Sequence, residues 1–516
     1  MEIYSKKTLY IMGSFLAGFS LMTVELVSSR IVAPIIGSSV FTWTSVIGIT
    51  LLGLSLGSWI GGTIADKRKS GKFLPLSFLV SSILVSLIPI LAKNTDFITN
   101  SSDSILKLNL FLSIYLFLLP SLAIGLIQPI ILKEYADDFS KIGSRYGILS
   151  AVWSIGSVLG VFLTGFFFIS NIGSMETIWL ISIILFLIGL IFSIGNKKML
   201  LFFLLVVIVV PIILYLTLEK TDKKSSIVFQ KETNYYDAMV LDRYIWGIGK
   251  SRILFLDADS HSIETQKPYQ YFYTEMYPVF GDLKNNIKNI LVIGAGAYTM
   301  PEHFKDYYKN AEVSVIETDP EMITIGNDYF NLKKYDIKTL VGDAKTVIAK
   351  DTTKYDVIFG DAYNSFISVP WYLLTKEWNT KIKERLNDDG IYAINFIGSV
   401  TGEDAKITES IANTFKLSFP NFYVFSFDQN KENIQNIVLV GINGNLPISE
   451  QDLYQKLLKG ENSFLANRLL PAGTLANSTS LILTDNFAPV EKLMEPSIKD
   501  FFSENLSFLK EINYPI

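Results

Sequence analysis

The sequence predicts two structural classes in one chain: an α-helical membrane bundle in the N-terminal part and a doubly wound α/β domain in the C-terminal part. Long apolar segments crowd the region before Glu219, whereas later β-like runs alternate with helical patterns and end in glycines and acids. We therefore expect a membrane domain at residues 1–218, a linker and small β subdomain at residues 219–285, and a catalytic α/β domain at residues 286–516.

Apolar segments long enough to cross a bilayer define the first part. Each has about 18 to 25 residues, which spans roughly 30 Å of hydrocarbon. The seven segments are residues 8–28, 41–65, 73–91, 110–132, 148–169, 177–194 and 199–218. The first lacks a cleavage site and is followed by further segments, so we expect an anchor and not a removed signal peptide. The lipid bilayer is thus an expected partner.

Basic residues predict the orientation of this multi-pass protein, because cytoplasmic loops are enriched in lysine and arginine. Seven crossings then place the α/β domain on the extracytoplasmic side. The assignment depends on residues 199–218, which contain Pro211, and on residues 30–39, a candidate to re-enter the bilayer. The basic residues assigned to the cytoplasmic side are Lys6, Lys7, Lys67, Arg68, Lys69, Lys72, Lys133, Lys141, Arg145, Lys197 and Lys198.

Composition argues against several kinds of site. The chain has no cysteine, which excludes disulfides and thiolate metal sites, and its two histidines and net charge of −4 favour neither a histidine-rich metal centre nor nucleic-acid binding.

Glu25 lies within an apolar segment, with Arg30 just beyond it. An acid inside a membrane segment can indicate a transport role. A packing pair between two helices is the favoured interpretation, because this acid stands alone.

The stretch from residue 289 to 361 has the layout of a nucleotide-cofactor site. A β-like run at residues 290–293 leads into Gly294-Ala295-Gly296, and glycines at a strand-to-helix turn let backbone N–H groups approach a ligand. Glu317 ends the next run about 20 residues later, where a carboxylate can accept both ribose hydroxyls. Thr299 stands where a dinucleotide fingerprint has its third glycine.

Two further acids repeat this pattern. Residues 338–341 lead to Gly342-Asp343-Ala344, and residues 355–359 lead to Gly360-Asp361-Ala362. Because the carboxyl ends of parallel strands meet at one edge of a sheet, Glu317, Asp343 and Asp361 are expected to line one site. The other expected elements are an antiparallel lid at 238–242 and 253–257, helices at 320–329, 371–386 and 404–417, and strands at 391–396 and 436–441.

These residues resemble the spermidine synthase family, and more closely its membrane-fused branch, over about residues 233–441. The resemblance implies a Rossmann-like, methyltransferase-type sheet. Its motifs are the segment from Leu256-Asp257 to Tyr273-Thr274-Glu275, the glycine turn, Glu317-Thr318-Asp319, Gly342-Asp343-Ala344 and the strand ending at Asp361, with branch-like segments at 369–375 and 483–490.

The resemblance implies aminopropyl transfer from decarboxylated S-adenosylmethionine to a small-molecule amine, with no metal. Asp361 would accept a proton from the attacking amine, and Tyr273 would orient it. The implied cofactor side is Gly294, Ala295, Gly296, Glu317, Thr318, Asp343 and Ala344, and the implied substrate side is His261, Glu275, Ala297, Asn364 and Asp485.

Three departures from the family pattern fall on the cation-binding side. Ala297 and Asn364 replace aspartates that bind ammonium groups, and His261 replaces a glutamine. Because a cation in a desolvated cleft needs negative charge, two alternatives stay open. One is the same fold with retained NAD or S-adenosylmethionine, acting outside the cell on a non-cationic substrate such as a surface glycan. The other is a nucleotide-binding membrane sensor or transporter. The sequence leaves a homodimer open.

Overall fold

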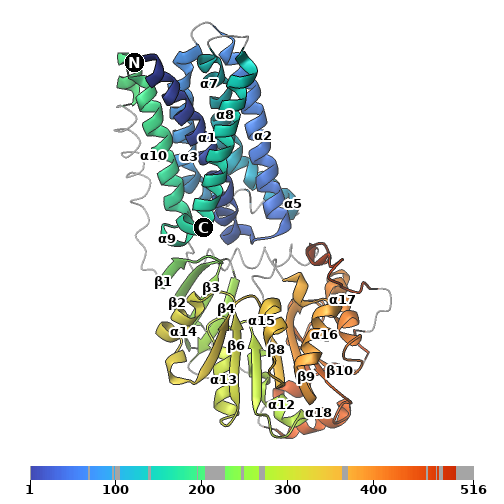
Figure 1. Ribbon diagram of the computed structural model, residues 1–516. Helices are drawn as coiled ribbons and strands as arrows, with labels where there is room; N and C mark the ends of the chain where they lie inside the picture. Colours follow the sequence, from blue (N-terminus) through green and yellow to red (C-terminus); the bar gives the residue numbers. More distant parts are fainter. Residues whose placement is uncertain are drawn as a thin grey trace. The chain divides into compact units, whose positions relative to one another are not determined.

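The computed structural model forms two compact units that meet in sequence between Ser225 and Ser226, and each is described here by itself (Figure 1). The structure describes residues 2–67, 70–95, 98, 105–136, 141–194, 196–203, 227–245, 249–257, 259–265, 273–362, 370–460, 463–471, 473–475 and 480–495.

The first unit is helical, and six stretches of its described residues are long and apolar enough to cross a membrane. The seventh expected segment, residues 199–218, lies mostly outside the described residues, so the seven-span count and the orientation remain predictions. The helices are α1 (Glu2–Ile36), α2 (Val40–Ala65), α3 (Phe73–Ala92), α5 (Ile105–Ser113), α6 (Leu119–Gly125), α7 (Ile127–Tyr135), α8 (Ile142–Leu163), α9 (Ile169–Asn171) and α10 (Ser174–Ser193).

Glycines set the packing of α2 against α6 and α7. A Cβ atom at Gly57 would collide with the carbonyl oxygen of Leu122, and one at Gly61 would lie 2.6 Å from the carbonyl oxygen of Leu126. Backbones therefore approach closely along this face, as small residues allow between membrane helices. Helix α1 continues unbroken through Arg30 to Ile36, so most of the candidate re-entrant stretch belongs to this helix.

The second unit begins with a four-stranded antiparallel sheet in the order β1-β2-β3-β4. It contains the expected lid. The strands are β1 (Ile227–Glu232), β2 (Asp237–Ile245), β3 (Gly249–Leu256) and β4 (Asp259–Thr265). Leu254 pairs with Ser262 and Phe255 with Ser260, which leaves His261 as the extra residue of a β-bulge. Bulges re-aim side chains, often next to sites.

A seven-stranded sheet follows, in the order β10-β11-β9-β8-β5-β6-β7. Neighbours from β9 to β7 are parallel, as expected, but β11 is antiparallel to both β9 and β10. The sheet is antiparallel at this edge because β10 and β11 form a hairpin, whose connection is too short for a crossover. The expected doubly wound α/β domain is confirmed. The strands are β5 (Asn289–Ile293), β6 (Glu312–Glu317), β7 (Ile337–Val341), β8 (Tyr355–Gly360), β9 (Leu386–Gly398), β10 (Phe422–Ser426) and β11 (Gln435–Ile442).

Helices cover this sheet, and β8 is buried along its whole length. The expected helix at 371–386 is instead a short 3₁₀ turn, Trp371–Leu373, followed by α16, because the Thr375 hydroxyl accepts a hydrogen bond from the Trp378 N–H and starts a new helix there. The helices are α12 (Tyr277–Leu283), α13 (Thr299–Tyr307), α14 (Glu321–Tyr329), α15 (Ala344–Lys350), α16 (Lys376–Arg385), α17 (Lys406–Lys416) and α18 (Glu450–Lys459).

Candidate active site

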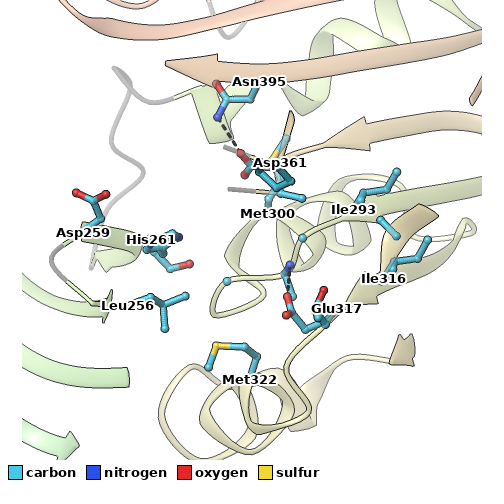
Figure 2. A pocket seen from close by; sticks show the side chains of 18 of the residues that line it. Leu256, Asp259, His261, Ile293, Met300, Ile316, Glu317, Met322, Asp361 and Asn395 are labelled. Atoms are coloured by element: carbon cyan, nitrogen blue, oxygen red, sulfur yellow. Dashed lines mark hydrogen bonds between the residues drawn. The ribbon is translucent and has the colours of Figure 1, made fainter. Parts of the chain in front are cut away.

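A cavity of about 300 Å³ lies along the carboxyl ends of the parallel strands, with β4 forming part of its wall (Figure 2). Residues from β6, β9 and the start of β11 line it, together with the glycine turn after β5 and Asp361 and Ala362 just after β8. In an open α/β sheet this edge is the usual place for a ligand.

The glycine turn and Glu317 are joined by hydrogen bonds. The Ala295 N–H donates to Glu317 Oε2 and the Asp319 N–H donates to Oε1, both at 2.9 Å. Both carboxylate oxygens are thus anchored at the cavity, and burial raises the pKa of Glu317 against the opposing effect of these N–H groups. Thr318 also lines the cavity.

Gly294 is required at its position for two separate reasons. Its φ of +92° is unfavourable for residues with a Cβ atom, and an added Cβ would collide with the carbonyl oxygen of Asp361. We expect Gly294→Ala to lower the free energy of unfolding by more than about 2 kcal/mol, which denaturant unfolding would measure. Gly402→Ala is the control, because Gly402 has a φ of +90° and open space around it. Equal losses in the two variants would contradict the collision.

Asp343 lies at the β7 end of the cavity and caps α15. Its Oδ1 accepts the Thr346 N–H at 3.0 Å, and its Oδ2 accepts the Tyr372 hydroxyl at 2.9 Å. Burial and this carboxylate raise the pKa of Tyr372 to about 12, so the phenol keeps its proton and remains a donor. Ala344 lines the cavity beside it.

Asp361 is the centre of a hydrogen-bond network. Its Oδ2 accepts the Tyr273 hydroxyl and its Oδ1 accepts the Asn395 side-chain amide, both at 2.8 Å. Asn436 in turn donates to Asn395 Oδ1 at 3.1 Å. The Tyr273 ring lies parallel to the Phe359 ring, with an interplanar angle of 3° and ring centroids 6.4 Å apart. Burial raises the pKa of Asp361, and the two neutral donors oppose that rise.

Asn395, Asn436 and Tyr372 line the cavity but were not identified from the sequence. The signal for Asn395 was a polar residue within an otherwise apolar strand, Ile391 to Phe396. Asn395 is only 2% exposed, and a buried amide must be hydrogen-bonded. The sequence therefore predicts a hydrogen-bond partner for it but does not identify that partner.

The β4 bulge places His261 and Ser262 at the cavity beside the glycine turn. The Ala297 N–H donates to the Ser262 hydroxyl at 2.9 Å, so strand and turn are in direct contact. Burial lowers the pKa of His261 to about 4, which leaves the imidazole uncharged near neutral pH.

Three predicted substrate-side residues are not brought together with these groups, and a fourth cannot be placed. Glu275 and Ala297 are buried, and neither lines the cavity. Asp485 accepts hydrogen bonds from Lys345 at 2.7 Å and from Thr375 at 2.8 Å, away from the cavity lining. Asn364 lies outside the described residues. The functional roles assigned to these four residues remain predictions.

The charges around the cavity have one sign. Asp259, Glu317, Asp343 and Asp361 line it, and the described lining residues include no lysine or arginine. Such a concentration of carboxylates attracts cationic ligands and disfavours anionic ones.

The spermine/spermidine synthase domain model matches residues 270–429, a range that includes Tyr273, the glycine turn and Asp361. The chain carries a spermidine synthase domain. The matched range also contains β6, β7 and β8, whose carboxyl ends lie at the acid-lined edge of the Rossmann-like sheet.

The curated relatives include polyamine aminopropyltransferases and, over shorter stretches, eEF1A lysine and N-terminal methyltransferases, all at low identity. The chain is 25% identical over 245 residues to a probable polyamine aminopropyl transferase of Bifidobacterium longum, covering 45% of this chain and 54% of that protein. It is 27% identical over 223 residues to a polyamine aminopropyltransferase of Vibrio vulnificus, covering 40% and 70%. Polyamine aminopropyltransferase 2 of Aquifex aeolicus is 23% identical over 408 residues, covering 73% and 77%. The chain thus spans about half the length of the first of these relatives.

Proposed function

We propose that this chain transfers an aminopropyl group from decarboxylated S-adenosylmethionine to an amine. The observation that carries the proposal is Asp361, held by Tyr273 and Asn395 in a cavity whose other charged lining residues, among those described, are also acids. The spermidine synthase domain and the polyamine aminopropyltransferase relatives support the same reaction.

The cavity fits an adenosine-bearing ligand. Leu256, Ile316 and Met322 supply apolar surface beside Glu317, and Figure 2 shows these side chains around one end of the cavity. Glu317 would accept hydrogen bonds from the ribose hydroxyls, and Asp343 would accept one from the adenine amino group. Backbone N–H groups already hold both carboxylates in place, so these side chains lose little conformational entropy when a ligand binds.

The glycine turn argues against NAD. A pyrophosphate at such a turn binds to backbone N–H groups, and three of those here already donate within the protein: Gly294 to the Ile316 carbonyl, Ala295 to Glu317 and Ala297 to Ser262. The surrounding carboxylates would also repel phosphate and the carboxylate of S-adenosylmethionine. Decarboxylated S-adenosylmethionine carries only positive charges on its side chain and suits this cavity better than either alternative.

The donor supplies a carbon activated by its sulfonium: the amine nitrogen forms a bond to that carbon while the carbon–sulfur bond breaks and a neutral thioether leaves. Asp361 accepts the proton that the acceptor's ammonium group loses to become the attacking amine. Tyr273 and Asn395 each donate to one oxygen of Asp361 and so aim its remaining lone pairs. The stacking of Tyr273 on Phe359 limits rotation of the phenol during this step.

The raised pKa of Asp361 predicts an acid limb in the rate. Only the ionised carboxylate can accept a proton, and burial makes Asp361 hold its own proton at a higher pH than the ordinary aspartate value of 3.8. We expect kcat/KM to fall with decreasing pH, with the fall centred above that value. A pH profile checks this, and a rate that stays constant down to the ordinary aspartate range would contradict the assignment of Asp361 as the base.

The transfer itself is tested directly with purified full-length protein in lipid nanodiscs. Incubation with decarboxylated S-adenosylmethionine and a panel of amines should yield, by mass spectrometry, an amine enlarged by one aminopropyl group together with methylthioadenosine. If a panel of mono-, di- and polyamines gives no such product while the donor binds, aminopropyl transfer is wrong for this chain.

We further propose that the six apolar helices anchor this domain to a lipid bilayer. The Aquifex match supports a shared arrangement, because 408 aligned residues exceed the length of the second unit, Ser226–Ser507. The loop charges predict that the second unit lies on the extracytoplasmic side. The alternative function, action on a surface glycan, requires that orientation. Protease treatment of intact cells would cleave the second unit if it is outside and would leave it intact if it is in the cytoplasm.

A further inference from the structure

The hydrogen bond between Tyr372 and Asp343 joins two different elements at the end of the cavity assigned to the adenine. Asp343 caps α15, whereas Tyr372 belongs to the 3₁₀ turn Trp371–Leu373 that precedes α16. The Tyr372 hydroxyl lies 2.9 Å from Asp343 Oδ2. Because an O–H···O hydrogen bond spans only about 2.5 to 3.0 Å, a small shift of α15 relative to this turn would break it.

Asp485 connects the same two regions from outside the cavity lining. Its Oδ2 accepts a hydrogen bond from Lys345 Nζ at 2.7 Å, and Lys345 is the second residue of α15. Its Oδ1 accepts the hydroxyl of Thr375, the N-cap of α16, at 2.8 Å. Lys345 lies two residues after Asp343, and the N-cap threonine lies three residues after Tyr372. The Asp485 carboxylate thus closes a ring of contacts around this end of the cavity.

The Thr375 hydroxyl ties the start of α16 to this carboxylate. It accepts a hydrogen bond from the Trp378 N–H at 3.3 Å, which leaves its single hydrogen to donate. The Asp485 oxygen, at 2.8 Å, is a closer acceptor for that hydrogen than the Tyr372 carbonyl oxygen at 3.4 Å. The group that caps α16 is therefore the group that contacts Asp485.

Backbone contacts hold Asp485 in place against α16. The Asp485 N–H donates to Glu377 Oε2 in the first turn of the helix at 3.0 Å. The Lys376 N–H donates to the Leu483 carbonyl oxygen, also at 3.0 Å. Because its main chain is bonded to α16 and its side chain reaches Lys345, Asp485 can fix the position of α15 relative to α16.

We propose that Asp485 is a positioning residue that fixes the adenine end of the cavity by holding α15 against the start of α16. It acts through the Tyr372–Asp343 hydrogen bond and does not contact the ligand, a role that takes the place of the substrate-side role expected from the sequence. The inference rests on the proposed function, in which Asp343 accepts a hydrogen bond from the adenine amino group. It predicts that Asp485 contributes to the selection of adenine over a base that lacks this amino group.

The test compares methylthioadenosine with methylthioinosine, in which a carbonyl oxygen replaces the amino group, by calorimetry on the full-length protein. The wild type should prefer methylthioadenosine, because a carboxylate accepts from an amino group and repels a carbonyl oxygen. We expect Asp485→Ala to reduce this preference about 3- to 10-fold, a moderate effect because the side chains of Lys345 and Asp485 are 42% and 36% exposed. Asp485→Asn should recover part of it, since an amide can accept from Lys345 and donate to the Thr375 oxygen.

A control variant and a double-mutant cycle distinguish positioning from general support of the fold. Glu409→Ala removes an acid of α17 that accepts the Ser480 hydroxyl at 2.5 Å, five residues before Asp485, and that lies outside the cavity lining. The preference for adenine should remain unchanged in this control. In a Tyr372→Phe background, which lacks the hydroxyl that holds Asp343, Asp485→Ala should cause little further loss, because the two changes act on one hydrogen bond.

The outcomes separate this inference from the proposed function. If the wild type binds neither nucleoside, or binds both equally, the adenine site of the proposed function is wrong and this inference fails with it. If the wild type prefers methylthioadenosine and Asp485→Ala keeps the full preference, only the role of Asp485 is wrong. Equal weakening of both nucleosides by Asp485→Ala, or a full additional loss in the Tyr372→Phe background, would also overturn the positioning role.

Discussion

Asp361→Asn is expected to lower kcat by roughly 10²- to 10⁴-fold, the usual contribution of a general base, with donor affinity nearly unchanged. The amide has almost the same shape as the carboxylate and still offers one oxygen as acceptor for Tyr273 or Asn395, but it cannot accept a proton from the amine. Single-turnover rates and calorimetric donor binding would measure the two effects separately.

Asp351→Asn is the matched control for this prediction. Asp351 also accepts a hydrogen bond from a tyrosine hydroxyl, that of Tyr355 at 2.7 Å, but it lies outside the cavity lining. The control should keep its turnover within a few-fold. Full turnover in Asp361→Asn would remove this residue from the mechanism, and loss of donor binding would assign it a binding role instead.

Glu317→Gln is expected to weaken binding of both the donor and methylthioadenosine by roughly 10- to 100-fold or more, because the ribose loses a charged acceptor. The variant should also lose about 1–3 kcal/mol of stability. A glutamine offers one acceptor oxygen, so either the Ala295 N–H or the Asp319 N–H would face an amide N–H₂ group in a buried place. Calorimetry and denaturant unfolding would measure these losses.

Glu312→Gln provides the comparison on the same strand. Glu312 begins β6, is exposed and lies outside the cavity lining, so its neutralisation should leave nucleoside affinity and stability nearly unchanged. Unaltered affinity for methylthioadenosine in Glu317→Gln would exclude Glu317 from the ribose site.

The sequence was sufficient to predict which strand ends meet. Glycines and acids follow β5, β6, β7 and β8, and the geometry of a parallel sheet brings Glu317, Asp343 and Asp361 to one edge whatever the details of packing. Each of these residues follows or ends a β-like run in the sequence, and the end of such a run is also the edge of the sheet in the fold. Tyr273 was identified from the family resemblance and not from periodicity.

The remaining cavity residues depend on features that local patterns do not encode. Asn395 and Asn436 meet because β11 runs antiparallel to β9, and that pairing is set by the β10–β11 hairpin. His261 lies at the cavity where a bulge shifts the register of β4 by one residue. Asp485 lies in a family-like segment, but its carboxylate is bonded to Lys345 and Thr375, outside the cavity lining.

The central claim is that the cavity selects a cationic adenosyl ligand, and competitive calorimetry on the full-length protein tests it most directly. The charges of the lining and the occupied N–H groups of the turn predict that decarboxylated S-adenosylmethionine binds more tightly than S-adenosylmethionine, and that NAD binds weakly or not at all. Tighter binding of NAD, or NAD released from the purified protein on denaturation, would contradict the account.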